Sequence, residues 1–106
     1  LGVESSEDPG PRYRAILVRS GIGEMQVRLG ERDAALAEST RALELLGGLP
    51  ADPANRARSS LRGQSHMRIA AIHAALGADA SLDKEDRREQ WRTARELYAR
   101  SLEIWQ

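Results

Sequence analysis

Two segments of this chain carry the same order of small and large residues, and this internal repeat restricts the fold more than any other feature. Residues 22–30 recur 47 positions later as residues 69–77, and residues 35–45 recur 59 positions later as residues 94–104. The two offsets differ by 12, which indicates an insertion within the second copy. A repeat built from paired apolar segments predicts stacked helix pairs, each burying its apolar face against its neighbour.

Capping signals divide the chain into four expected helices. Glycine commonly ends a helix, Asp is a preferred N-cap, and Pro is tolerated in the first turn. The expected helices are one from Arg12 to Gly30, one with Asp33 in its first turn ending at Gly47 and Gly48, one from Pro53 to Leu76 with Asp52 as N-cap, and one capped by Ser81 or Asp83 that continues to the end. We expect the insertion to add about three turns to the front of the fourth helix.

The apolar residues of each expected helix follow spacings of three and four, which place them on one face. We expect these faces to form one shared core, with Ile22, Leu43, Ile69 and Leu102 turned away from water. The four faces are Ala15, Val18, Ile22, Met25 and Leu29; Ala35, Ser39, Ala42 and Leu46; Leu61, Ser65, Ile69, Ile72 and Leu76; and Trp91, Ala94, Tyr98, Ser101 and Trp105.

Composition restricts the class of protein. The 106 residues suffice for one domain, and residues 1–11, rich in Gly, Pro, Ser and acid, are expected to form a flexible arm before a helical domain over residues 12–106. Sixteen basic and 16 acidic residues give no net attraction to nucleic acid, and no apolar run is long enough for a membrane helix. The absence of cysteine leaves the compartment open, with a slight preference for the cytoplasm. Because the chain begins with Leu, we expect it to be a piece of a longer protein.

Several of these residues resemble the tetratricopeptide (TPR) signature. They are a small residue inside each first helix (Gly23, Ala70), Gly at its end (Gly30, Gly77), Ala early in each second helix (Ala35, Ala94), and the matching segments 41–45 and 100–104. The resemblance implies an all-α fold of two antiparallel helix-turn-helix units, residues 12–48 and 53–106, as an α-solenoid fragment. A compact four-helix bundle is the alternative, because the aromatic residue usual in each first helix is missing and the second unit is interrupted.

The tail, residues 91–105, resembles C-terminal segments of large bacterial eukaryotic-type serine/threonine kinases. This resemblance implies that the chain is an accessory module of such a kinase, with the catalytic domain elsewhere in the parent protein.

The sequence contains no residue pattern that indicates catalysis or the binding of a phosphate or metal ion. The glycines around Ile22 lack the third Gly and the Gly-Lys-Ser/Thr run of phosphate loops. His66 and His73 are seven residues apart, about 10.5 Å along a helix, too far to chelate one metal ion by themselves. Ser59 and Ser60 have no recognisable His or acidic partner. We therefore expect no catalytic residue, metal or cofactor, and no enzymatic activity in this chain.

The expected function is protein–protein interaction through a groove on the first helices of the two units. Its mixed lining suits an apolar helix or peptide. Alternatives are a structural spacer or a dimerisation segment that pairs through the terminal helix, and a nucleic-acid-associated module, which the balanced charge disfavours. By the TPR resemblance, the groove residues are Leu17, Ser20, Glu24, Val27 and Arg28 from the first unit and Gln64, Met67, Arg68, Ala71 and Ala74 from the second.

Overall fold

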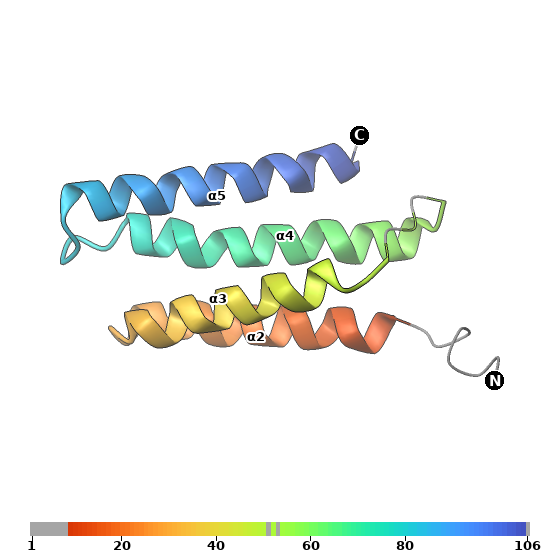
Figure 1. The fold of residues 1–106 in the computed structure, drawn as a ribbon, viewed down its shortest axis with the longest axis horizontal. Helices are drawn as coiled ribbons and strands as arrows, with labels where there is room; N and C mark the ends of the chain where they lie inside the picture. The colour runs from red at the N-terminus through yellow and green to blue at the C-terminus, as the bar shows by residue number, and fades with distance from the viewer. Residues whose placement is uncertain (1–8, 51, 53, 106) are drawn as a thin grey trace.

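The structure, a computed structural model, describes residues 9–50, 52 and 54–105. These residues form four helices and no strand: α2 (Gly10–Arg28), α3 (Arg32–Gly47), α4 (Arg56–Gly77) and α5 (Lys84–Trp105) (Figure 1). The all-α class with four helices is thereby confirmed. The expected flexible arm lies outside the described residues except for its last three positions, and there α2 already begins at Gly10, with Pro11 in its first turn.

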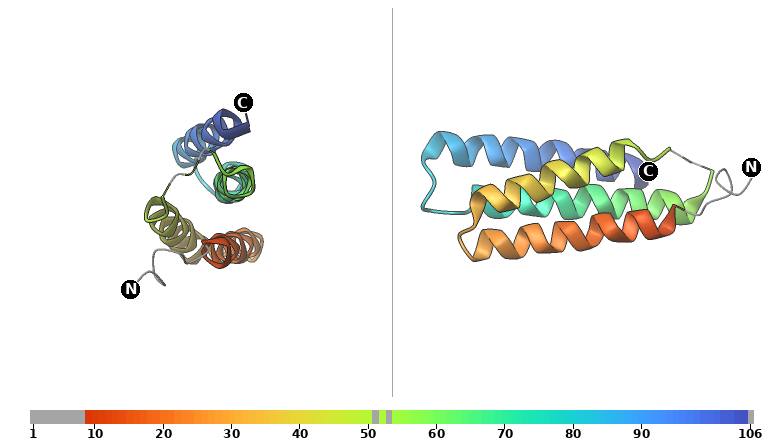
Figure 2. Two further views of the ribbon diagram at one scale, coloured as in Figure 1. Left: turned by 90° about the vertical axis from the view of Figure 1, so that its right-hand side faces the viewer. Right: turned by 60° about the horizontal axis from the view of Figure 1, so that its bottom comes forward.

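The helices form two antiparallel pairs, α2 with α3 and α4 with α5, stacked side by side (Figure 2). Helix α4 is the central element, because it packs against each of the other three, whereas α5 packs chiefly on α4. Arg19 and Glu38 link α2 to α3 through an ion pair of 3.2 Å. The arrangement follows from the sequence repeat, since α4 and α5 pair as α2 and α3 do.

The buried apolar residues form two clusters along α4. The larger cluster joins Ile69 and Ala70 of α4 to residues of all three other helices, and the smaller one joins Ile72 and Leu76 to Val27 and Ala35. The faces predicted for the second and third helices are confirmed, because their members are buried, with Leu61 partly so. The larger cluster consists of Tyr13, Ile16, Ala42, Leu46, Leu49, Ile69, Ala70 and Leu97.

The face predicted for the first helix is wrong. The residues of α2 that are buried are Gly10, Tyr13, Ile16, Ser20, Gly23 and Val27, and they too follow spacings of three and four. The predicted face lies on the opposite side of the helix. Small residues decide the outcome, because Ser20 and Gly23 let α2 approach its neighbours closely, which Val18 and Ile22 would not allow.

The face predicted for the fourth helix is half right. Ala94 and Ser101 are buried, but Trp91 and Tyr98 are exposed and Leu97 is buried in their place. Leu102 is also exposed, and the side chain of Trp105 lies outside the described residues. Helix α5 turns this way because the Ser101 hydroxyl donates a hydrogen bond of 3.0 Å to the Gly63 carbonyl of α4, which holds the small-residue side of α5 against α4.

The expectation that Gly30 ends the first helix is confirmed, since α2 ends two residues before it. Gly30, with φ +79°, follows α2; its N–H donates to the Val27 carbonyl (3.1 Å) and that of Glu31 to the Gln26 carbonyl (2.8 Å). These two bonds form a Schellman motif, which requires a left-handed residue where Gly30 lies.

The N-cap of α4 differs from the predicted one, and the structure shows which of the two predicted residues caps α5. Helix α4 begins three residues later than predicted, because Asn55, not Asp52, is the N-cap: its side-chain oxygen accepts from the Arg58 N–H at 3.1 Å. For α5, Asp83 is the cap, since its carboxylate accepts from the Asp86 N–H at 2.9 Å.

The insertion adds fewer helical turns than expected. Ala35 is the fourth residue of α3, whereas its counterpart Ala94 is the eleventh of α5, so α5 gains about two turns rather than three. The remaining inserted residues lengthen the connection before α5, where the Asp79 carboxylate accepts from the Ser81 hydroxyl at 2.6 Å.

Candidate interaction surfaces

A row of large apolar side chains runs along the outside of α2. We define the α2 stripe as Val18, Ile22, Met25 and Leu29, whose exposed fractions lie between 45 and 66%. At about 100° per residue, the stripe lies on the side of α2 opposite its buried residues. Helix α2 is therefore apolar on two opposite sides, although only one of them contacts α3 and α4.

The predicted groove is assembled in part. From α2, Leu17 and Glu24 are half-buried and Arg28 is exposed, with Glu24 and Arg28 3.6 Å apart as an ion pair. From α4, five residues share the outer face: Gln64, Met67 and Arg68 are exposed, and Ala71 and Ala74 are half-buried.

Two of the predicted groove residues point into the protein. The Ser20 hydroxyl donates to the Ile16 carbonyl at 2.8 Å within α2, and Val27 belongs to the smaller core cluster. Both are buried, so they cannot contact a ligand held on the outside of α2.

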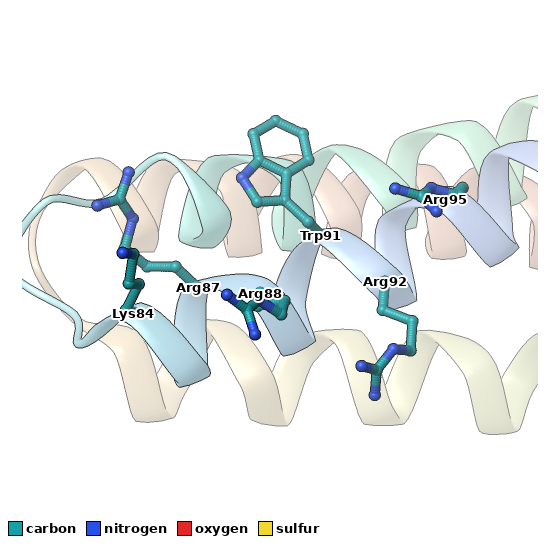
Figure 3. Close-up of a pocket in the computed structure, with 6 residues that line it drawn as sticks. All are labelled: Lys84, Arg87, Arg88, Trp91, Arg92 and Arg95. Carbon is teal, nitrogen blue, oxygen red and sulfur yellow. The ribbon is translucent and has the colours of Figure 1, made fainter.

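A third surface, not predicted from the sequence, lies on α5. Trp91 stands beside a surface cavity of about 610 Å³ that is otherwise lined by five cations of the same helix (Figure 3). The lining residues are Lys84, Arg87, Arg88, Trp91, Arg92 and Arg95.

Two contacts hold this part of α5 in place. The Arg87 Nε donates to the Gly77 carbonyl at 3.0 Å. Trp91 lies over Gly77, where a Cβ atom would come within 2.8 Å of the indole nitrogen. Trp91 is nevertheless 47% exposed, so the expectation that it belongs to the core is wrong.

A chain of buried polar groups connects three helices. His73 Nε2 lies 2.7 Å from the Ser39 hydroxyl, and His73 Nδ1 lies 2.6 Å from the Gln90 side-chain oxygen. With a proton on Nδ1, His73 donates to Gln90 and accepts from Ser39, so every group is satisfied. The connectivity resembles a nucleophile, a base and an orienting group, but Ser39 is only 2% exposed. A substrate cannot approach its hydroxyl, and the chain acts as a link between α3, α4 and α5.

Both histidines of α4 are buried. Burial lowers the pKa of His73, against the opposing effect of its hydrogen bond to Gln90. Burial also lowers the pKa of His66, whose Nδ1 donates to the Arg62 carbonyl at 3.1 Å. Among the residues that the structure describes, no group of three or more His, Cys, Asp or Glu side chains could hold a metal ion.

Gln90 was not predicted to have a role, and Tyr98 and Leu102 were expected in the core, whereas both are exposed. Gln90 carries no sequence signal, because its role depends on the packing of α5 against α4. Tyr98 and Leu102 do carry one, since the offset of 59 matches them to Ser39 and Leu43, which face α4.

Comparison of the chain with protein-family models, with curated proteins and with solved structures gives no match. Within the described part of the chain, each helix is too short or too polar to span a membrane.

Proposed function

We propose that this chain is a non-catalytic module that binds other proteins. The observation that carries the proposal is the α2 stripe. The apolar side of a helix is typically turned to a core or to a partner, yet only one of the two apolar sides of α2 is covered by α3 and α4 while the other is open. Contiguous exposed apolar surface of this kind marks interaction sites in soluble proteins.

We further propose that the two helix pairs are TPR-like units. The packing supports this, because Gly23 and its counterpart Ala70 are both buried where a first helix crosses its neighbours. An open stack, rather than a closed bundle, is favoured because α2 and α5 lie on different sides of α4. The finer proposal of an accessory segment in a bacterial serine/threonine kinase depends on the tail resemblance alone.

A dimerisation segment is the second candidate function. The exposed Trp91, Tyr98 and Leu102 on α5 favour it, because large apolar side chains on a terminal helix are typical of surfaces that pack on another protein.

Photo-crosslinking tests the first proposal. A photoreactive amino acid at Met25, in the α2 stripe, should give covalent adducts with another polypeptide when the full-length gene product is irradiated in its native cells. The same amino acid at Thr40, exposed on α3, is the matched control and should give none. Equal yields at the two positions, no adduct at Met25, or crosslinks only within the same polypeptide would refute the proposal.

A further inference from the structure

We propose that copies of this chain associate head to tail, the α2 stripe of one copy packing on the exposed α4–α5 surface of the next. We define this α4–α5 surface as Met67, Trp91, Tyr98 and Leu102. The assignment of the partner depends on the proposed function above, because it names what the α2 stripe binds.

The internal repeat shows what kind of surface the α2 stripe is. At the offset of 47, its four residues match Ser65, Ile69, Ile72 and Leu76 of α4. All four of these are almost completely buried, and the three apolar ones lie in the clusters that join α4 to the α2–α3 pair. The α2 stripe is thus the counterpart, on α2, of the surface by which α4 packs on the helix pair that precedes it.

At the other end of the molecule, the surface of α5 that corresponds to the α4-facing side of α3 is also uncovered. Within the chain, α3 meets α4 through Ser39, whose hydroxyl contacts His73, and through Leu36 and Leu43, which pack on the two clusters. At the offset of 59, these residues match Tyr98, Arg95 and Leu102 of α5. All three are exposed, Leu102 by 62%.

The exposed apolar residues divide between these two ends. Each large hydrophobic residue found exposed in the described part of the chain belongs either to the α2 stripe or to the α4–α5 surface. Through the repeat, the two surfaces correspond to the two sides of the interface between the helix pairs, with Tyr98 in place of Ser39 and Arg95 in place of Leu36. A second copy of the chain supplies both with the partner that the repeat specifies.

A polar group at the α2 end agrees with this assignment. Gln26 is the counterpart of His73 at the offset of 47, and its side-chain oxygen is buried without a hydrogen-bond partner among the described residues. His73 receives the Ser39 hydroxyl from the preceding helix pair. Tyr98, the counterpart of Ser39, would bring a hydroxyl to the same end of α2 from a second copy.

Because the two surfaces differ, the contact is heterologous and leaves one of each free after every addition. The molar mass of the purified protein should therefore rise with concentration beyond that of a dimer. Light scattering coupled to size exclusion measures this mass. Ile22→Glu disables the α2 stripe, and Leu102→Glu disables the α4–α5 surface. Each variant alone should remain a monomer, since a charge replaces an exposed apolar group at the contact, and circular dichroism should show unchanged helicity.

An equimolar mixture of the two variants gives the sharpest test. The Ile22→Glu copy keeps an intact α4–α5 surface and the Leu102→Glu copy keeps an intact α2 stripe, so the mixture should form a dimer, about twofold the monomer mass, and nothing larger. Thr40→Glu, on an exposed position of α3, should associate as the unchanged chain does.

Three results would overturn the inference: a monomer at every concentration, a mass that stops at the dimer for the unchanged chain, or a variant mixture that stays monomeric. If the chain is monomeric but Met25 crosslinks to a different protein, head-to-tail association fails while the proposed function stands.

Discussion

Gly23 lies where α2 meets both α3 and α4, and its missing side chain decides how closely the three helices approach. A Cβ atom on Gly23 would lie 2.7 Å from Ile72 Cδ1 and 3.3 Å from Glu38 Cβ. Ile72 is fully buried, so it has no solvent into which to move. Gly21, two residues earlier in the same helix, has no such neighbour within 4 Å. The two glycines therefore differ in packing while sharing a helical backbone.

We expect Gly23→Ala to lower the free energy of unfolding by about 1 kcal/mol. Overpacking costs roughly 1–3 kcal/mol, whereas the better helix propensity of alanine returns up to about 1 kcal/mol. Gly21→Ala, the matched control, should raise the free energy of unfolding by about 0.5–1 kcal/mol, because it gains propensity without a clash. Urea denaturation measures both. If Gly23→Ala is as stable as Gly21→Ala, the close approach at Gly23 is not tight.

At the scale of the helix, the beginning of α4 depends on which side chain satisfies the first backbone N–H groups. Asp52 and Asn55 are both suitable N-caps by residue type. Only Asn55 accepts from a first-turn N–H, while Asp52 forms a half-exposed ion pair of 3.1 Å with Arg58. The helix therefore begins after Asn55, and Asp52 belongs to the turn that precedes it.

Asn55→Ala should lower the free energy of unfolding by about 1 kcal/mol, the usual cost of losing an N-cap. Asp52→Ala should cost less than half of that, because partly exposed ion pairs contribute little. Thermal unfolding followed by circular dichroism measures the difference. A larger loss for Asp52→Ala than for Asn55→Ala would place the beginning of the helix at the position that the sequence predicted.

At the scale of the whole molecule, buried polar groups connect the two helix pairs. The Ser39–His73–Gln90 chain joins α3 to α4 and α4 to α5, with Ser39 and His73 buried and Gln90 partly buried. Buried hydrogen-bond chains of this kind are stabilising only while every member stays satisfied. Protonation of His73 would place a charge there, and burial opposes that charge.

The lowered pKa of His73 makes stability depend on pH. Above the ordinary value of 6.5 the histidine is neutral in both states, so its contribution is fully present there. As the pH falls below 6.5, the unfolded chain takes up a proton before the folded chain does, and the free energy of unfolding falls. His66, whose pKa is also lowered, adds a loss of the same sign.

We therefore expect the chain to be less stable at about pH 5.5 than at about pH 7.5. His73→Gln, which keeps a polar side chain but cannot be protonated, should lose less stability between the two pH values. Urea denaturation of both proteins at both pH values gives the two differences. An equal pH-dependent loss in the variant would show that protonation of His73 is not linked to unfolding.

The predictable part of the fold is the part where each helix has a single apolar side. For α3 the spacing identified the buried residues, because the opposite side is polar or small. For α4 it identified the side that faces α2 and α3, but not the second buried side, with Ala70 and Gly77, that packs on α5. For α2, both sides follow the same spacing, and the more apolar side is the exposed one. For α5, the aromatic residues suggested the core, but the contacts of Ser101 and Leu97 turn Trp91 and Tyr98 outward.

The predicted groove residues likewise lie on the outer face of α4 but only in part on the outside of α2. The groove residues on α4 lie away from its contact with α2 and α3, three of them exposed and Ala71 and Ala74 half-buried. Ser20 and Val27 are buried because α2 is turned differently. The α2 stripe could not be recognised as a surface until its orientation was known.

The amino-acid sequence by itself determined that this protein is helical, where most of its helices end, and that its second half repeats its first. Those properties depend on capping, glycine placement and periodicity, which act over a few neighbouring residues. Only the tertiary structure decided which side of α2 and α5 is buried. That choice depends on how closely neighbouring helices can approach, because Gly23, Ser20 and Ser101 permit contacts that larger residues on the more apolar sides would prevent.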